Sequence, residues 1–129
     1  MVPGYAALNV TSNFTFLRGA SHPEELVTEA ARLNYNAIAI TDECTVSGLV
    51  RAHVAAKDCG IQLVIGASFV IDDAPQLSRL LLLATSREGY GNLSQLITLT
   101  RRRSLKGQYR LLLTMCCRRR RRSQTVLPL

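Results

Sequence analysis

Two adjacent carboxylates, Asp42 and Glu43, are the residues of this 129-residue chain best suited by type to acid–base chemistry. They follow the short apolar segment 37–40 after one residue, Thr41, so they stand in a loop at the carboxyl end of a predicted strand. A carboxylate pair can serve as acid and base only when both side chains reach the same substrate. Neighbours in sequence need not converge in this way, so we favour a role for the pair in anchoring the loop.

Other candidate ligands and nucleophiles are dispersed along the chain. The histidines, His22 and His53, lie 31 positions apart, one at the start of a predicted helix and one inside another, and dispersed histidines are usually ordinary surface or core residues. No Cys-x-x-Cys zinc spacing occurs, and no activating base stands beside Cys44. The four cysteines are therefore expected to be free thiols in a reducing compartment: Cys44, Cys59, Cys116 and Cys117.

Basic residues are concentrated at the end of the chain. Residues 1–100 hold six Lys or Arg and nine Asp or Glu, a net charge of −3, whereas residues 101–129 hold ten Lys or Arg and no acidic residue. Clustered arginines bind nucleic acid phosphates without sequence choice, which makes Arg101, Arg102 and Arg103 candidate contacts. The negative end of a helix dipole also favours cations at that place with no ligand. For the arginine run 118–122 we favour a solvated, disordered tail.

Apolar runs and helix signals alternate along the first hundred residues. Ser21 with Glu24 forms a predicted capping box, and Pro23 suits the first turn of the helix that follows. Short apolar runs predict strands over residues 5–10, 37–40, 62–65, 68–71 and 80–84. Helical patterns cover residues 21–34, 48–58 and 90–103, and Gly60 is expected to end the second. This alternation predicts an α/β fold with a mostly parallel sheet and flanking helices.

The chain has no feature that directs it to a membrane. No apolar run reaches the ~18 residues that a membrane span requires, and no basic region followed by a long apolar stretch opens the chain as a secretory signal would. We therefore expect a cytoplasmic protein without membrane contact.

Four segments, in this order, resemble the N-terminal PHP (polymerase and histidinol phosphatase) domain of error-prone C-family DNA polymerases, which are similar to the polymerase III alpha subunit. They are residues 12–27, 40–44, 48–57 and 89–98. The resemblance covers about residues 5–110 and implies an incomplete PHP-type (β/α) barrel. It also implies a family role in DNA synthesis during damage-tolerant replication and repair, with DNA and other replication or repair proteins as partners. The acidic residues for nucleotidyl transfer are not in this chain, so polymerase activity is not expected.

The resemblance also indicates where a metal ion would bind. PHP phosphoesterases carry two histidines one residue apart after the first strand, an Asp-His pair after the second and a Glu after the third. This chain has Asn9 and Thr11, then Asp42 and Glu43, then Ser68 at those places. Amide and hydroxyl oxygens are weak ligands for zinc or manganese, and two carboxylates alone cannot supply a catalytic site. We therefore predict no catalytic residue, no bound metal and no cofactor.

The composition divides the chain into a partial PHP domain over residues 1–110 and a basic tail over residues 111–129, disordered or translated out of frame. A closed α/β barrel needs roughly 200–250 residues, so an open sheet edge and marginal stability are expected.

Two alternatives stay open beside the inactive PHP fragment. One is a stand-alone metal-dependent phosphoesterase of the PHP type, which would need ligands that Asn9, Thr11 and Ser68 do not provide. The other is a small nucleic-acid-binding protein that acts through its basic tail.

Overall fold

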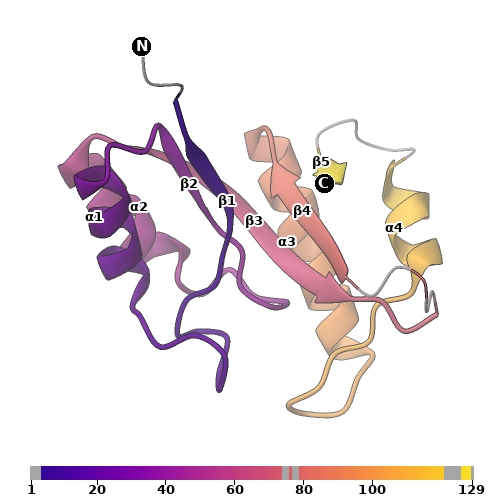
Figure 1. The fold of residues 1–129 in the computed structure, drawn as a ribbon. Coiled ribbons are helices and arrows are strands. Elements are labelled where there is room, and N and C mark those ends of the chain that lie inside the picture. The colour runs from indigo at the N-terminus through magenta and orange to yellow at the C-terminus, as the bar shows by residue number, and fades with distance from the viewer. Residues whose placement is uncertain (1–3, 74–75, 77–78, 121–125, 129) are drawn as a thin grey trace.

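The computed structural model describes residues 4–73, 76, 79–120 and 126–128, and it forms one five-stranded sheet with helices packed on it (Figure 1). The strands follow one another across the sheet in sequence order: β1 (Ala6–Val10), β2 (Ala37–Ile40), β3 (Gln62–Val70), β4 (Arg79–Ala84) and β5 (Val126–Pro128). The helices are α1 (Pro23–Arg32), α2 (Leu49–Cys59), α3 (Arg87–Arg102) and α4 (Leu113–Arg120).

The sheet is parallel in its first part and antiparallel in its second. Strands β1, β2 and β3 pair in parallel, joined by α1 and α2, whereas β3–β4 and β4–β5 are antiparallel. The predicted α/β fold is confirmed, and its parallel portion comprises the first three strands.

Helices α1, α2 and α3 lie on the same face of the sheet. Ile38 pairs with Leu63 and Ile40 with Ile65, and residues two apart on a strand share a face. Ile38, Ile40 and Leu63 pack with side chains of α1 and α2, whereas Ile65 packs with those of α3. In Figure 1, α1 and α2 lie together at the left and α3 lies behind β3 and β4. This is how helices surround the strands of an α/β barrel.

Two apolar clusters hold this layer together. The first, between α1, α2 and the sheet, has Val27 and Ala52 at its centre, both fully buried. The second, between α3 and the antiparallel strands, contains Phe69, Leu93 and Leu111. Since α1 and α2 meet through small alanines, their axes can approach closely over β2, whose four residues are all buried.

Local signals placed the helix ends to within a few residues. Helix α1 begins with Pro23 at its first position, as predicted, but its capping residue is His22, whose N–H donates to the Glu25 carboxylate at 2.9 Å. The predicted capping box of Ser21 and Glu24 was therefore one residue early. Helix α2 ends at Gly60, as predicted, in the left-handed conformation (φ 70°) that glycine adopts without a steric penalty.

Two further boundaries differ from the predictions. Strand β3 is continuous where we expected two strands with a loop at Gly66. A Cβ on Gly66 would meet Leu83 Cδ2 at 2.6 Å, so this glycine allows β4 to approach rather than interrupting the strand. Helix α3 starts at Arg87 and not at Tyr90, because Ser86 Oγ accepts a hydrogen bond from Gly89 N–H at 3.0 Å and caps the helix there.

The segment expected to be a tail, residues 111–129, holds helix α4 and strand β5 where it is described. Leu111 is fully buried and forms a bridge with Ile71. Part of the arginine run 118–122 lies outside the described residues, and the domain boundary at residue 110 stays a prediction. Among the described residues, no helix combines the length and apolar character needed to cross a bilayer.

Candidate functional site

Asp42 holds the loop that follows β1 against the end of β2. Its carboxylate is buried, and its three hydrogen-bond donors all come from that loop. They are Ser12 N–H at 2.7 Å, Ser12 Oγ at 2.6 Å and Thr15 Oγ1 at 2.8 Å. Hydrogen bonds to an ionised carboxylate are among the stronger ones in proteins, so Asp42 fixes the position of this loop.

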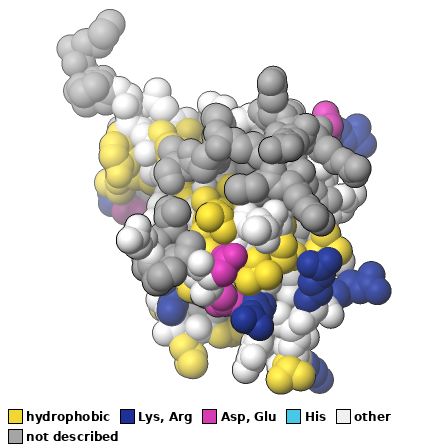
Figure 2. Space-filling view, turned by 90° about the vertical axis from the view of Figure 1, so that its right-hand side faces the viewer, with side chains coloured by type: hydrophobic (Ala, Val, Ile, Leu, Met, Phe, Trp, Pro, Cys, Tyr) yellow, Lys and Arg dark blue, Asp and Glu magenta, His cyan; other side chains and the backbone are white. Residues whose placement is uncertain are grey.

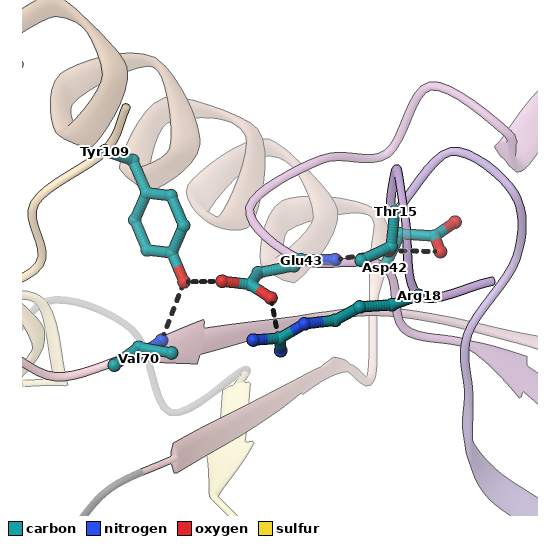
Figure 3. Close-up of polar contacts among 6 residues, drawn as sticks. All are labelled: Thr15, Arg18, Asp42, Glu43, Val70 and Tyr109. Carbon is teal, nitrogen blue, oxygen red and sulfur yellow. Dashed lines mark hydrogen bonds and ion pairs between the residues drawn. The ribbon is translucent and has the colours of Figure 1, made fainter. Parts of the chain in front are cut away.

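Glu43 contacts a different set of groups. Its Oε2 lies 2.9 Å from Arg18 Nη1, and its Oε1 accepts a hydrogen bond of 2.7 Å from the Tyr109 hydroxyl. Its own N–H donates to Thr15 Oγ1 at 3.0 Å. Figure 3 shows the two carboxylates pointing in opposite directions, that of Asp42 toward Thr15 and that of Glu43 toward Tyr109 and Arg18. Such a pair does not act together on one substrate atom.

Tyr109 connects Glu43 to the end of β3. Its hydroxyl donates to Glu43 and accepts from Val70 N–H at 2.9 Å, and its ring meets that of Phe69 edge-on. Burial, followed by the hydrogen bond to the Glu43 carboxylate, raises the pKa of Tyr109 above its usual range. Neither Tyr109 nor Arg18 could be identified from the sequence, because residues 66 and 25 positions from Glu43 leave no local pattern.

The raised pKa of Tyr109 predicts a decline of stability at alkaline pH. A pKa that is higher in the folded state favours folding at pH values below about 10, the value in the unfolded chain, and this contribution is lost as the pH rises further. We expect Tyr109→Phe to lower the free energy of unfolding by about 1–2 kcal/mol at pH 7. The difference in the free energy of unfolding between this variant and the unsubstituted protein, measured by urea unfolding, should become smaller above pH 10. Tyr5→Phe, at an exposed tyrosine, is the control, and a gap of constant size for Tyr109→Phe would contradict this account.

The other predicted cleft positions do not form a ligand set with the two carboxylates. Asn9 Oδ1 accepts a hydrogen bond from Thr41 Oγ1 at 3.2 Å, and Thr11 is exposed. Ser68 lies within β3 rather than in a loop, and its backbone pairs with Asp42 O and with Cys44 N–H. In the part of the chain that the structure describes, no group of three or more His, Cys, Asp or Glu is placed to hold a metal ion.

The candidate nucleophile, Cys44, and the two histidines lie on different elements of the fold. Cys44 is buried, which raises the pKa of its thiol and disfavours the reactive thiolate. His22 Nδ1 lies 2.9 Å from Asn13 Nδ2 at the start of α1, and His53 is exposed on α2. A hollow of about 10 Å³ beside Asp42, lined also by Ile40, has room for roughly one water molecule.

The three candidate nucleic-acid contacts at the end of α3 differ in environment. Arg101 donates to the Cys44 carbonyl oxygen, with Nη2 at 3.2 Å, and its guanidinium lies 5.4 Å from the centre of the Tyr109 ring. All three residues are exposed. On the face shown in Figure 2, the Lys and Arg side chains occupy several separate places around a hydrophobic area. Nucleic-acid contact through Arg101, Arg102 and Arg103 stays a prediction.

Comparison with known proteins agrees with this architecture. The profile of the PHP domain family matches residues 7–122. Error-prone DNA polymerase of Bordetella parapertussis is 59% identical over 112 residues, which is 84% of this chain and 11% of that polymerase. The corresponding polymerase of Methylococcus capsulatus is 57% identical over 108 residues, which is 84% of this chain and 10% of that protein.

A solved structure shares the fold at lower identity. A candidate metal-dependent phosphoesterase of Bifidobacterium adolescentis superimposes with a TM-score of 0.61 and 23% identity, over 78% of this chain and 34% of that one. The present chain therefore spans about a third of that protein and about a tenth of the polymerases. With helices on one face of a curled sheet and a profile match along almost its whole length, this chain belongs to the PHP domain family.

Proposed function

We propose that this chain is the PHP region of an error-prone DNA polymerase and that its role is structural rather than catalytic. The identity of 59% to such a polymerase supports the first part. In this role the region would support DNA synthesis that is carried out elsewhere in the full-length family, in damage-tolerant replication and repair. DNA, together with other replication or repair proteins, would be the partner, and the cytoplasm the compartment.

The observation that carries the structural role is that both carboxylates already bind other groups of the protein. Asp42 accepts three hydrogen bonds from a neighbouring loop, and both oxygens of Glu43 have protein partners. A catalytic acid or base needs an oxygen that reaches the substrate. These side chains instead connect the loop after β1, the end of β2 and the segment after α3.

The second candidate function is that of the phosphoesterase with the same fold. It requires a divalent metal ion, and the donors present do not fit one. Asn9 and Thr11 stand where histidines are expected, and neutral oxygens bind zinc and manganese weakly. The Asp42 and Glu43 carboxylates point away from each other (Figure 3), so they do not converge on one ion.

A phosphatase assay separates the two functions. We expect the purified chain to hydrolyse p-nitrophenyl phosphate and its bis-ester no faster than buffer does, with Mn²⁺ or Zn²⁺ present. Glu43→Gln serves as the matched variant, because it keeps the size of the side chain while removing its charge. Metal-dependent turnover that disappears in Glu43→Gln would establish the phosphoesterase and reject the structural role. Turnover that persists in the variant would identify a contaminant.

A further inference from the structure

We propose that the Arg18 guanidinium is the resident cation at Glu43 and that it excludes a divalent metal ion from this carboxylate. The proposal rests on the structural role proposed above and adds a reason for it. The loss of ligands explains why a metal would bind weakly. A protein cation already held at the carboxylate explains why a metal would be actively disfavoured.

The geometry at Glu43 carries this inference. Arg18 Nη1 lies 2.9 Å from Glu43 Oε2, while the other oxygen accepts the hydrogen bond from Tyr109. The carboxylate is therefore contacted on both oxygens by protein donors from two distant segments. In Figure 3 the Arg18 side chain extends beneath Glu43, so that its guanidinium reaches the carboxylate on the side away from Asp42.

The loop that carries Arg18 is built to hold it there. Thr15 is bonded to Asp42 and to the Glu43 N–H, and the N–H groups of Arg18 and Gly19 both donate to the Thr15 carbonyl oxygen. Leu17 adopts a left-handed conformation (φ 65°), which is uncommon for a residue with a branched side chain. This turn fixes the backbone of Arg18, and the side chain, 54% exposed, reaches Glu43 from there.

The charge of Arg18 also disfavours a metal ion at Glu43. Glu43 is an acidic side chain with 21% of its surface exposed, and Arg18 is the cation that the described residues place against it. A second cation beside the same carboxylate would be repelled by the guanidinium, and a divalent ion would be repelled about twice as strongly as a monovalent one. The chemistry is thus that of a carboxylate neutralised by arginine, with the metal excluded by like charge.

The test measures Mn²⁺ affinity by electron paramagnetic resonance of the free ion, which requires no enzymatic activity. Arg18→Met removes the charge and keeps most of the stem, so we expect Mn²⁺ to bind about tenfold or more tightly than to the unsubstituted chain. Glu43→Gln in the Arg18→Met background should abolish that gain. Arg18→Lys keeps a cation at the site and should bind Mn²⁺ no better than the unsubstituted chain does.

A matched control lies on α1, where Arg32 forms an exposed ion pair with Glu29 at 2.6 Å. Arg32→Met also frees a carboxylate, yet we expect no gain in Mn²⁺ affinity, because Glu29 is 54% exposed whereas Glu43 is 21% exposed. Circular dichroism verifies that each variant is folded. Equal affinities in Arg18→Met and the unsubstituted chain, without phosphatase turnover, would reject the resident cation and leave the structural role standing. Tight Mn²⁺ binding with turnover by the unsubstituted chain would reject both.

Discussion

Replacement of Asp42 by alanine is expected to lower the free energy of unfolding by about 3–5 kcal/mol, because it leaves three hydrogen-bond donors in a buried loop without their acceptor. The substitution removes all of the acceptors for Ser12 N–H, Ser12 Oγ and Thr15 Oγ1. Each buried donor left without a partner costs about 1–3 kcal/mol. Natural domains have about 5–15 kcal/mol in total, so the loss would be a large share of the stability. Urea unfolding followed by far-ultraviolet circular dichroism measures the loss.

Two further variants test whether the loss of stability depends on the hydrogen bonds that Asp42 accepts. Asp42→Asn keeps the volume but offers an amide N–H where a donor already points, so we expect a loss of about 1–3 kcal/mol. Asp58→Ala removes an exposed carboxylate from the last turn of α2, where the helix dipole disfavours it, and should change stability by less than about 0.5 kcal/mol. Similar small losses in Asp42→Ala and Asp58→Ala would contradict the assignment of Asp42 as the anchor of the loop.

Local rules were sufficient for those parts of the fold whose cause lies within a few residues. Pro23 marks the first turn of α1, Gly60 the end of α2, and the buried strand β2 coincides with the apolar segment 37–40. Each of these features depends on backbone geometry or on a short apolar run. None of them requires knowledge of a distant partner.

The errors come from features that depend on distant residues. Gly66 suggested a break, but its small size serves the approach of β4, which pairs with β3 some 17 positions further along the chain. Asp42 and Glu43 could be selected from the sequence because of their type and their place after a strand. Their partners could not, since Tyr109 reaches Glu43 only after α3 has packed on the sheet. Local composition does not contain that information.

Replacement of Gly19 by alanine tests how closely the loop after β1 is packed. A Cβ at this position would lie 2.1 Å from the Ser12 carbonyl oxygen and 2.5 Å from its carbon, both backbone atoms. Ser12 cannot easily move away, because its N–H and hydroxyl are both bonded to Asp42. We expect Gly19→Ala to lower the free energy of unfolding by about 3 kcal/mol, the upper part of the range for overpacking.

Gly91→Ala is the matched control for this effect. Gly91 lies within helix α3, and among the described residues no atom other than those of its neighbours and its own helix backbone stands within 4 Å of the place where its Cβ would be. Alanine is favoured over glycine inside a helix by about 0.5–1 kcal/mol, so this variant should gain stability in the same urea titration. The two substitutions should change the free energy of unfolding in opposite directions, because backbone atoms occupy the space for a Cβ at Gly19 but not at Gly91. A neutral Gly19→Ala would show that the loop is free to move, and with it the Arg18 guanidinium that the loop places on Glu43.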